Sequence, residues 1–175
     1  VKTGRITLRG ASHPIPDHEG VKGVDKMFDL TNGLSKRDLV ITLMSGGGSA
    51  LMPYPAPGIT LEDKRELTSV LLRAGVNINE LNSVRKHISG FKGGQFARHV
   101  YPARMINLLL SDVIGDPVDT IASGPTSPDE SSFMEARGVV VKYGLLDDIP
   151  SNVLTRLNAG MNGMVPETPK SSDPI

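Results

Sequence analysis

The chain has 175 residues and a mass of 18.7 kDa, which suits one domain with a buried core. Its 19 basic and 19 acidic residues cancel, and a net charge of zero argues against a nucleic-acid partner. The absence of cysteine excludes disulfides, thiolate catalysis and cysteine-ligated metals. The apolar runs are too short to span a membrane and no signal peptide opens the chain, so we expect a cytoplasmic protein.

In chain order, the first half predicts a weak strand over 6–8, an extended loop over 13–17, a helix over 21–30, a buried strand over 38–44 and a helix over 61–74. Two prolines fix the extended loop, and Gly33 ends the first helix. Thr60 and Asp63 form a capping-box variant at the start of the last helix. Helices and strands therefore alternate from the start.

The second half predicts helices over 79–87 and 92–100, a buried strand over 105–110, helices over 131–143 and 151–159, and a flexible tail or linker over 161–175. Alternation of strands with helices indicates an α/β fold with a mostly parallel sheet, built from residues 1–160. Such sheets bind ligands beyond the carboxyl ends of their strands. Both buried strands here run into loops of glycine, serine and aspartate, so we expect the site there.

The first of these loops is rich in glycine and consists of Ser45, Gly46, Gly47, Gly48 and Ser49. Without side chains, glycines let backbone amides approach a phosphate, and a helix after the loop would add its positive end. A flexible strand-to-helix turn is the plain alternative. The position directly after a buried strand favours anion binding over that alternative.

Standard phosphate and nucleophile motifs do not fit this loop. A Walker A motif needs a Gly-Lys pair, and the chain has none. A dinucleotide fingerprint that starts at Gly46 fails at Leu51, and the nucleophile elbow fails at the same residue. These departures argue against an ordinary P-loop enzyme, a standard NAD-binding domain and an α/β-hydrolase.

Charge is segregated along the second half of the chain. Residues 81–111 contain no acid, and residues 105–136 contain no base. The basic side chains are Arg85, Lys86, Lys92, Arg98 and Arg104, and the acidic ones are Asp112, Asp116, Asp119, Asp129, Glu130 and Glu135. Such runs are usually solvated surfaces. Asp112 and Asp116 follow a strand's carboxyl end, which favours a role in Mg²⁺ or substrate binding for these two.

Two further loops are candidates for anion binding. Lys92 with Gly93 and Gly94 would place an ammonium and free amides at one anion, and a surface loop explains the same letters equally well. The segment with Ser123, Gly124 and Thr126 is rigid and rich in hydroxyls, so it would bind phosphate or sugar hydroxyls. For this second loop, composition alone favours a structural turn.

Seven segments, in this order and spacing, resemble the glycerate 2-kinases that carry a C-terminal MOFRL domain. These segments are Ala11–Asp17, Asp38–Ile41, Ser45–Leu51, Glu80–Ser89, Lys92–Gly94, Ser111–Asp116 and Ile121–Thr126. The resemblance implies a Rossmann-like, three-layer α/β/α domain. It also implies transfer of the ATP γ-phosphoryl group to the 2-hydroxyl of D-glycerate, giving 2-phosphoglycerate, with Mg²⁺. Both small molecules are then the expected partners.

Matched position by position, the resemblance implies catalytic roles for Arg85, Lys92, Asp112 and Asp116, and the two aspartates are also the Mg²⁺ candidates. The cofactor-binding positions are Ser45, Gly46, Gly47, Gly48, Ser49, Lys86, Gly93, Gly94, Ser123, Gly124 and Thr126. We expect Arg85 and Lys92 to pair with phosphoryl oxygens. Either aspartate would orient the substrate hydroxyl or bind Mg²⁺, and the sequence does not decide between them.

The chain departs from the family in three ways. Residue 117 is Pro and residue 18 is His where an acid is common. Family chains are considerably longer, so we expect an incomplete fold that lacks the MOFRL domain, is inactive alone and self-associates through exposed apolar surface. The alternatives are a non-catalytic nucleotide- or anion-binding module and, less favoured, an NAD(P)H-dependent hydroxypyruvate reductase.

Overall fold

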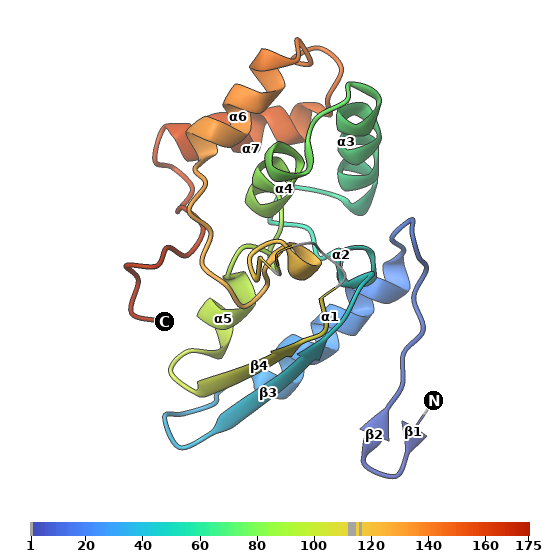
Figure 1. Cartoon of the computed structure of the whole chain (residues 1–175), viewed down its shortest axis with the longest axis vertical. Helices are drawn as coiled ribbons and strands as arrows, with labels where there is room; N and C mark the ends of the chain where they lie inside the picture. The colour runs from blue at the N-terminus through green and yellow to red at the C-terminus, as the bar shows by residue number, and fades with distance from the viewer. Residues whose placement is uncertain (1, 112–114, 116) are drawn as a thin grey trace.

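The computed structural model describes residues 2–111, 115 and 117–175 (Figure 1). Its elements are β1 (Lys2–Thr3), β2 (Ile6–Thr7), α1 (His18–Thr31), β3 (Leu39–Met44), α2 (Gly48–Leu51), α3 (Leu61–Arg73), α4 (Ile78–His87), α5 (Gln95–Val100), β4 (Arg104–Leu109), the 3₁₀ turn η1 (Ile121–Ser123), α6 (Phe133–Lys142) and α7 (Ser151–Met161). The predicted alternation of strands and helices is confirmed. In this part of the chain, no helix is long and apolar enough to cross a membrane.

β3 and β4 form a parallel pair, in register from Leu39 opposite Arg104 to Met44 opposite Leu109. Helices α1 and α5 lie on one face of this pair, where Val24, Phe91, Phe96 and Val100 form a small core against Val40 and Met105. The parallel sheet is thus confirmed.

The other face of the pair is apolar and exposed. It carries Leu39, Ile41, Leu43, Ile106, Leu108 and Leu110, which are 47% to 77% exposed. Parallel sheets normally have both faces covered. Among the described residues only one face is covered, so the three-layer arrangement implied by the family resemblance is not seen here.

Helices α3, α4, α6 and α7 form a second unit with its own core, at the top of Figure 1. Two capping boxes fix where its helices begin. Thr60 and Asp63 cap α3 as predicted, and Ser132 and Glu135 cap α6 in the same way. Leu67, Val84 and Val140 lie at the centre of this core and are fully buried. The functional candidates lie where this helical unit meets the sheet.

The segment after α7 is extended but packed, which corrects the expectation of a flexible tail over 161–175. Thr168 is 2% exposed, and its hydroxyl donates to Asp129 at 3.0 Å. The backbone N–H of Asp129 donates to the carbonyl of Pro169 at 2.8 Å, and the Lys170 ammonium donates to the carbonyl of Asp129 at 2.7 Å. Proline and serine content suggested flexibility, but these tertiary hydrogen bonds hold the segment in place.

Candidate functional site

The glycine-rich loop joins the carboxyl end of β3 to α2, as predicted. Gly47 has φ +81°, a left-handed conformation that favours glycine. A Cβ on Gly48 would lie 2.9 Å from the Cβ of Ala122, so this residue lets the loop approach η1 closely. Helix α2 has four residues, and its dipole is correspondingly small. The positive end expected after the loop therefore contributes little, and charge must come from side chains.

Ser49 is the centre of this junction. Its hydroxyl accepts a hydrogen bond from the Arg85 guanidinium at 2.6 Å and lies 2.8 Å from the Ser123 hydroxyl. Its carbonyl accepts from the Lys92 ammonium at 2.9 Å. The same ammonium lies 3.4 Å from the carbonyl of Ala122. The structure thus brings together four residues predicted for the site from β3–α2, α4, the loop before α5, and η1.

The η1 loop has an unusual backbone. Ala122, Ser123 and Gly124 are successive left-handed residues, with φ of 51°, 62° and 59°. Left-handed conformation costs energy for residues with a Cβ and often occurs at functional sites. The amides of Gly93 and Gly94 donate to the carbonyls of Ser123 and Gly124 at 3.1 and 2.8 Å.

These backbone bonds correct the expectation of free amides at Gly93 and Gly94. Both amides hold the η1 loop rather than facing a ligand. A Cβ on Gly124 would lie 2.7 Å from the carbonyl oxygen of Asp119, so only glycine fits there. Thr126 follows this loop and is half-buried. The role of these glycines is to shape the backbone around Lys92 and Ser123.

Two buried cations, Lys64 and Lys92, and the partly buried Arg85 lie around this junction, and their pKa values reflect their poor hydration. Burial lowers the pKa of the Lys92 ammonium well below its ordinary value, and the neighbouring charges of Arg85 and Lys64 lower it further. Burial likewise lowers the pKa of the Lys64 ammonium to about 7, with Arg85 and Arg156 adding to the effect. Burial also lowers the pKa of the Arg85 guanidinium. These groups repel one another in a medium that solvates them poorly.

None of these three cations pairs with a carboxylate within the described residues. Lys64 donates to the carbonyl of Tyr54 at 3.1 Å, and Lys92 and Arg85 have the carbonyl and hydroxyl partners given above. Buried charge without an opposite charge is costly, and structures rarely retain it without a use. The arrangement is therefore suited to hold an anion, and phosphate oxygens fit its donors.

Sequence reasoning missed Lys64, although the sequence contains a signal for it. Residues 64, 67 and 71 lie on one face of α3, and Leu67 and Leu71 are fully buried. Helical spacing therefore places Lys64 at a core position, where it is 6% exposed. A lysine at a position that the pattern reserves for an apolar residue indicates a special role.

Lys86 points away from the junction, unlike its neighbour Arg85. Its ammonium lies 3.3 Å from a carboxylate oxygen of Asp119 and 3.4 Å from one of Asp129. Its ammonium is therefore directed to two carboxylates and not to the junction around Ser49, and its predicted role in anion binding stays a prediction. Asp112 and Asp116, the predicted catalytic and metal residues, lie outside the described residues.

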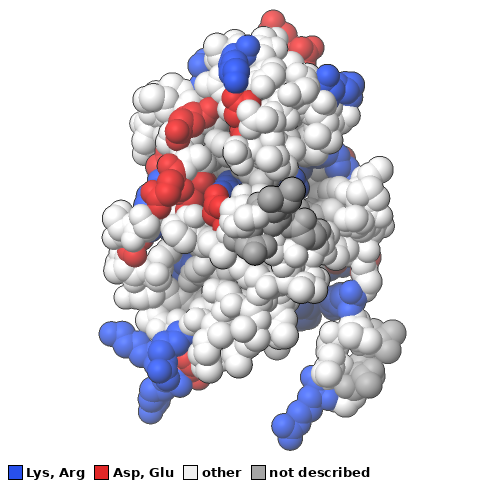
Figure 2. All heavy atoms as spheres, in the orientation of Figure 1, with Lys and Arg blue, Asp and Glu red and all other residues white. Residues whose placement is uncertain are grey.

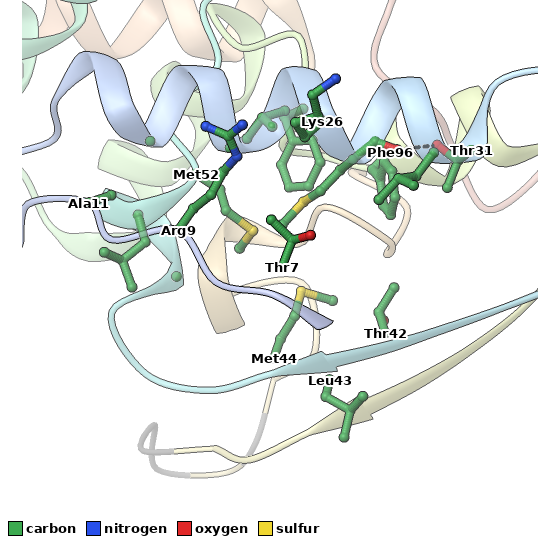
Figure 3. A pocket seen from close by; sticks show the side chains of 18 of the residues that line it. Thr7, Arg9, Ala11, Lys26, Thr31, Thr42, Leu43, Met44, Met52 and Phe96 are labelled. Atoms are coloured by element: carbon green, nitrogen blue, oxygen red, sulfur yellow. Dashed lines mark hydrogen bonds between the residues drawn. The ribbon is translucent and has the colours of Figure 1, made fainter. Parts of the chain in front are cut away.

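A cavity of about 660 Å³ opens on the sheet side of the glycine-rich loop. Figure 3 shows it between α1 and β3, with Met44 and Met52 directed into it and Arg9 at its side. Ser45, Gly46 and Gly48 line it, and the remaining wall is mostly apolar. The cavity thus touches the loop, but Lys64, Arg85 and Lys92 do not line it.

Comparison with known proteins places this chain in a family. The chain matches the family described as "Domain of unknown function (DUF4147)" over residues 1–158, and it belongs to that family. It spans about two fifths of the length of the curated relatives it matches.

The names of similar proteins indicate which enzymes of this family the chain resembles. The D-glycerate 2-kinase of Thermotoga maritima is 47% identical over 135 residues, which are 77% of this chain and 32% of that protein. An Agrobacterium vitis protein named as a hydroxypyruvate reductase is 42% identical over 173 residues, 99% of this chain and 38% of its own. A crystal structure of a Pyrococcus horikoshii protein matches with a TM-score of 0.94 and 40% identity, covering 99% of this chain and 40% of that one. The predicted resemblance to glycerate 2-kinases is confirmed.

Proposed function

We propose that this chain supplies the phosphate-binding part of an enzyme that phosphorylates D-glycerate. The reaction would transfer the γ-phosphoryl group of ATP to the 2-hydroxyl and give 2-phosphoglycerate. The observation that carries the proposal is a set of three cations, the buried Lys64 and Lys92 and the partly buried Arg85, without a carboxylate partner in the described part of the chain. The name of the Thermotoga maritima relative supports the substrate.

Phosphoryl transfer requires charge neutralisation and positioning more than covalent help. The Arg85 guanidinium presents planar donors that match phosphate oxygens, and Ser49 holds it in place at 2.6 Å. Lys92 would contact the same phosphate oxygens, because its ammonium is held on the carbonyl of the same serine at 2.9 Å. Anion binding would raise the depressed pKa of Lys92 and so favour its charged form.

Mg²⁺ is the metal that this reaction implies. Among the described residues, no three acidic or histidine side chains gather in a way that would hold a metal ion. The two residues that we propose for the metal, Asp112 and Asp116, lie outside that part of the chain. The steps above therefore rest on the cations alone.

Binding tests this proposal directly. Titration calorimetry would measure the affinity of the 175-residue chain for ATP and for inorganic tripolyphosphate. Arg85→Met and Lys92→Met are the site variants, and Lys22→Met, at an exposed lysine on α1, is the control. We expect each site variant to bind both ligands at least about tenfold more weakly, because each variant loses a charge-assisted hydrogen bond. Equal affinity in all four proteins would contradict the proposal.

Catalysis is tested in a chimera, because the chain spans only part of its relatives. Residues 1–175 would replace the matching part of the Thermotoga maritima enzyme, and the product would be identified as 2- or 3-phosphoglycerate. ATP binding without turnover, in a folded chimera, would favour a non-catalytic anion-binding module. NADPH-dependent reduction of hydroxypyruvate would favour the function named for the Agrobacterium vitis relative.

A further inference from the structure

A second cavity lies on the neighbouring face of α4, and the proposed function does not use it. Its volume is about 390 Å³. One wall is α4, where Asn79, Asn82, Ser83 and Lys86 follow one another at helical spacing. The other wall consists of the segments 118–120 and 127–131. Most of the lining residues are polar, and four of them carry hydroxyl groups, although carbon atoms contribute much of the surface.

Ser83 contributes a buried hydroxyl that has no partner among the residues that the structure describes. The residue is 8% exposed, and its Oγ makes no hydrogen bond to any of these residues. Such groups are rare because the lost hydration is not repaid. Ser83 lines the cavity, but its hydroxyl oxygen is enclosed, so a change of side-chain rotamer would have to turn it toward a ligand that supplies the missing bond.

The charges that line this cavity indicate which class of ligand it would bind. Asp129 is 1% exposed, and its oxygens are occupied by Lys86, Ser131 and Thr168. The Asp119 side chain is 52% exposed and has acceptor capacity left beside its contact with Lys86. Three carboxylates, those of Asp119, Asp129 and Glu130, and the single ammonium of Lys86 leave the cavity acidic. Acidic side chains gather at mid-height on the left of Figure 2. An anion is disfavoured here, whereas a neutral group with several hydroxyls fits the acceptors and donors.

Hydrogen bonds connect this cavity to the anion site. Asn82 lines the cavity, and its side-chain oxygen accepts from the Ser123 hydroxyl at 3.2 Å. Ser123 in turn contacts Ser49, on which Arg85 is fixed. Asn82 and Arg85 are three residues apart on α4, so their side chains are neighbours at about 5–6 Å between Cβ atoms. A nucleotide has the same sequence of groups, a neutral sugar next to phosphates.

We propose that this cavity binds the vicinal diol of the nucleotide ribose, with Asp119 accepting from the ribose hydroxyls and Ser83 completing the contact. Carboxylates bind ribose hydroxyls in this way in other nucleotide sites. The inference rests on the proposed function, because it assumes a nucleotide with phosphates at Arg85 and Lys92. D-Glycerate also carries a vicinal diol, but its carboxylate suits an acidic cavity poorly.

The test uses the 175-residue chain and four ligands: ATP, 2′,3′-dideoxy-ATP, inorganic tripolyphosphate and D-glycerate. Ser83→Ala and Asp119→Asn are the site variants, and Asp147→Asn, an exposed acid between α6 and α7, is the control. We expect the original chain to prefer ATP over the dideoxy nucleotide by roughly tenfold. Both site variants should reduce that preference to about twofold or less and leave tripolyphosphate affinity unchanged.

The melting temperature separates ligand binding by Ser83 from a purely structural role. Alanine removes a hydroxyl that has no partner among the described residues. Ser83→Ala should therefore fold with unchanged or higher melting temperature while its preference for the ribose falls. An unchanged ATP-to-dideoxy ratio in both variants would overturn the inference. A weaker affinity for D-glycerate with an unchanged affinity for ATP in the site variants would also overturn the inference, because the cavity would then bind the substrate.

The two proposals fail separately. If tripolyphosphate does not bind the original chain, the proposed phosphate site is wrong. Ligand-observed NMR with adenosine and 2′,3′-dideoxyadenosine would then still measure the preference for the diol, because neither nucleoside carries phosphates. Equal NMR signals for these two nucleosides would overturn the ribose site.

Discussion

Replacing Lys64 by methionine should stabilise this protein and weaken its anion site. The side chain is 6% exposed, and its ammonium has only the carbonyl of Tyr54 as a partner in the described structure. Methionine fills a similar volume and carries no charge. The variant therefore removes the cost of burying an ammonium beside Arg85 and Arg156.

The pKa of Lys64 sets the size of the effect. Burial and neighbouring cations lower that pKa from 10.5 to about 7. At pH 7 this difference corresponds to about 4 kcal/mol of lost stability, because the unfolded chain binds a proton that the folded chain holds only half the time. Losing the hydrogen bond to Tyr54 costs about 1 kcal/mol. The expected net gain for Lys64→Met is about 3 kcal/mol at pH 7.

The sign of the pH dependence separates this reasoning from a simple packing effect. Between pH 7 and 10.5 the unfolded original chain binds more protons at Lys64 than the folded chain does, so the free energy of unfolding of the original chain rises with pH. Lys64→Met lacks this group, so its free energy of unfolding lacks this rise. Denaturant unfolding at pH 7, 8.5 and 10 should show the gain shrink toward zero. Lys22→Met, at an exposed position, should change stability by less than about 0.5 kcal/mol. A destabilised Lys64→Met, or a gain independent of pH, would refute the argument.

Three other substitutions test separate parts of the structure. Gly124→Ala should lose at least about 2 kcal/mol in chemical denaturation, because φ is +59° and its Cβ would lie 2.7 Å from the Asp119 carbonyl oxygen. Asp129→Asn should cost about 3 kcal/mol at pH 7 by removing a buried partner of Lys86. Burial raises the pKa of Asp129, but Lys86 and its hydrogen bonds leave it below 3.8, so this cost should disappear in denaturation measured well below pH 3.8. Leu43→Lys, at a position 77% exposed on the bare sheet face, should reduce self-association in sedimentation velocity without lowering the melting temperature.

The secondary structure followed from the sequence because its causes are local. The strand predicted over 38–44 is β3, and the capping pair Thr60 and Asp63 starts α3 where the letters placed it. Loops at the ends of parallel strands were expected to carry the site, and Ser49 lies in the short helix α2 that follows the carboxyl end of β3. Periodicity, capping and strand-end loops act over a few residues, so a single sequence reveals them.

The direction of each charged side chain did not follow from the sequence. Arg85 and Lys86 are adjacent on α4, yet one faces Ser49 and the other faces two aspartates. A motif that contains both basic residues predicts one common role for them. Which face of a helix is buried, and against which loop, depends on the path of η1 and of the segment after α7, and these are tertiary features.

The stability of the fold and the chemistry of the site therefore oppose each other at the same residues. Lys64 and Lys92 occupy buried positions where an apolar residue would be more stable, and Ala122 and Ser123 adopt left-handed backbone at a cost. Natural proteins retain such costs where function requires them. If phosphate is what these groups hold, ligand binding should recover part of that cost. Saturating tripolyphosphate should then raise the melting temperature of the original chain more than that of Lys64→Met, although Lys64→Met melts higher without ligand.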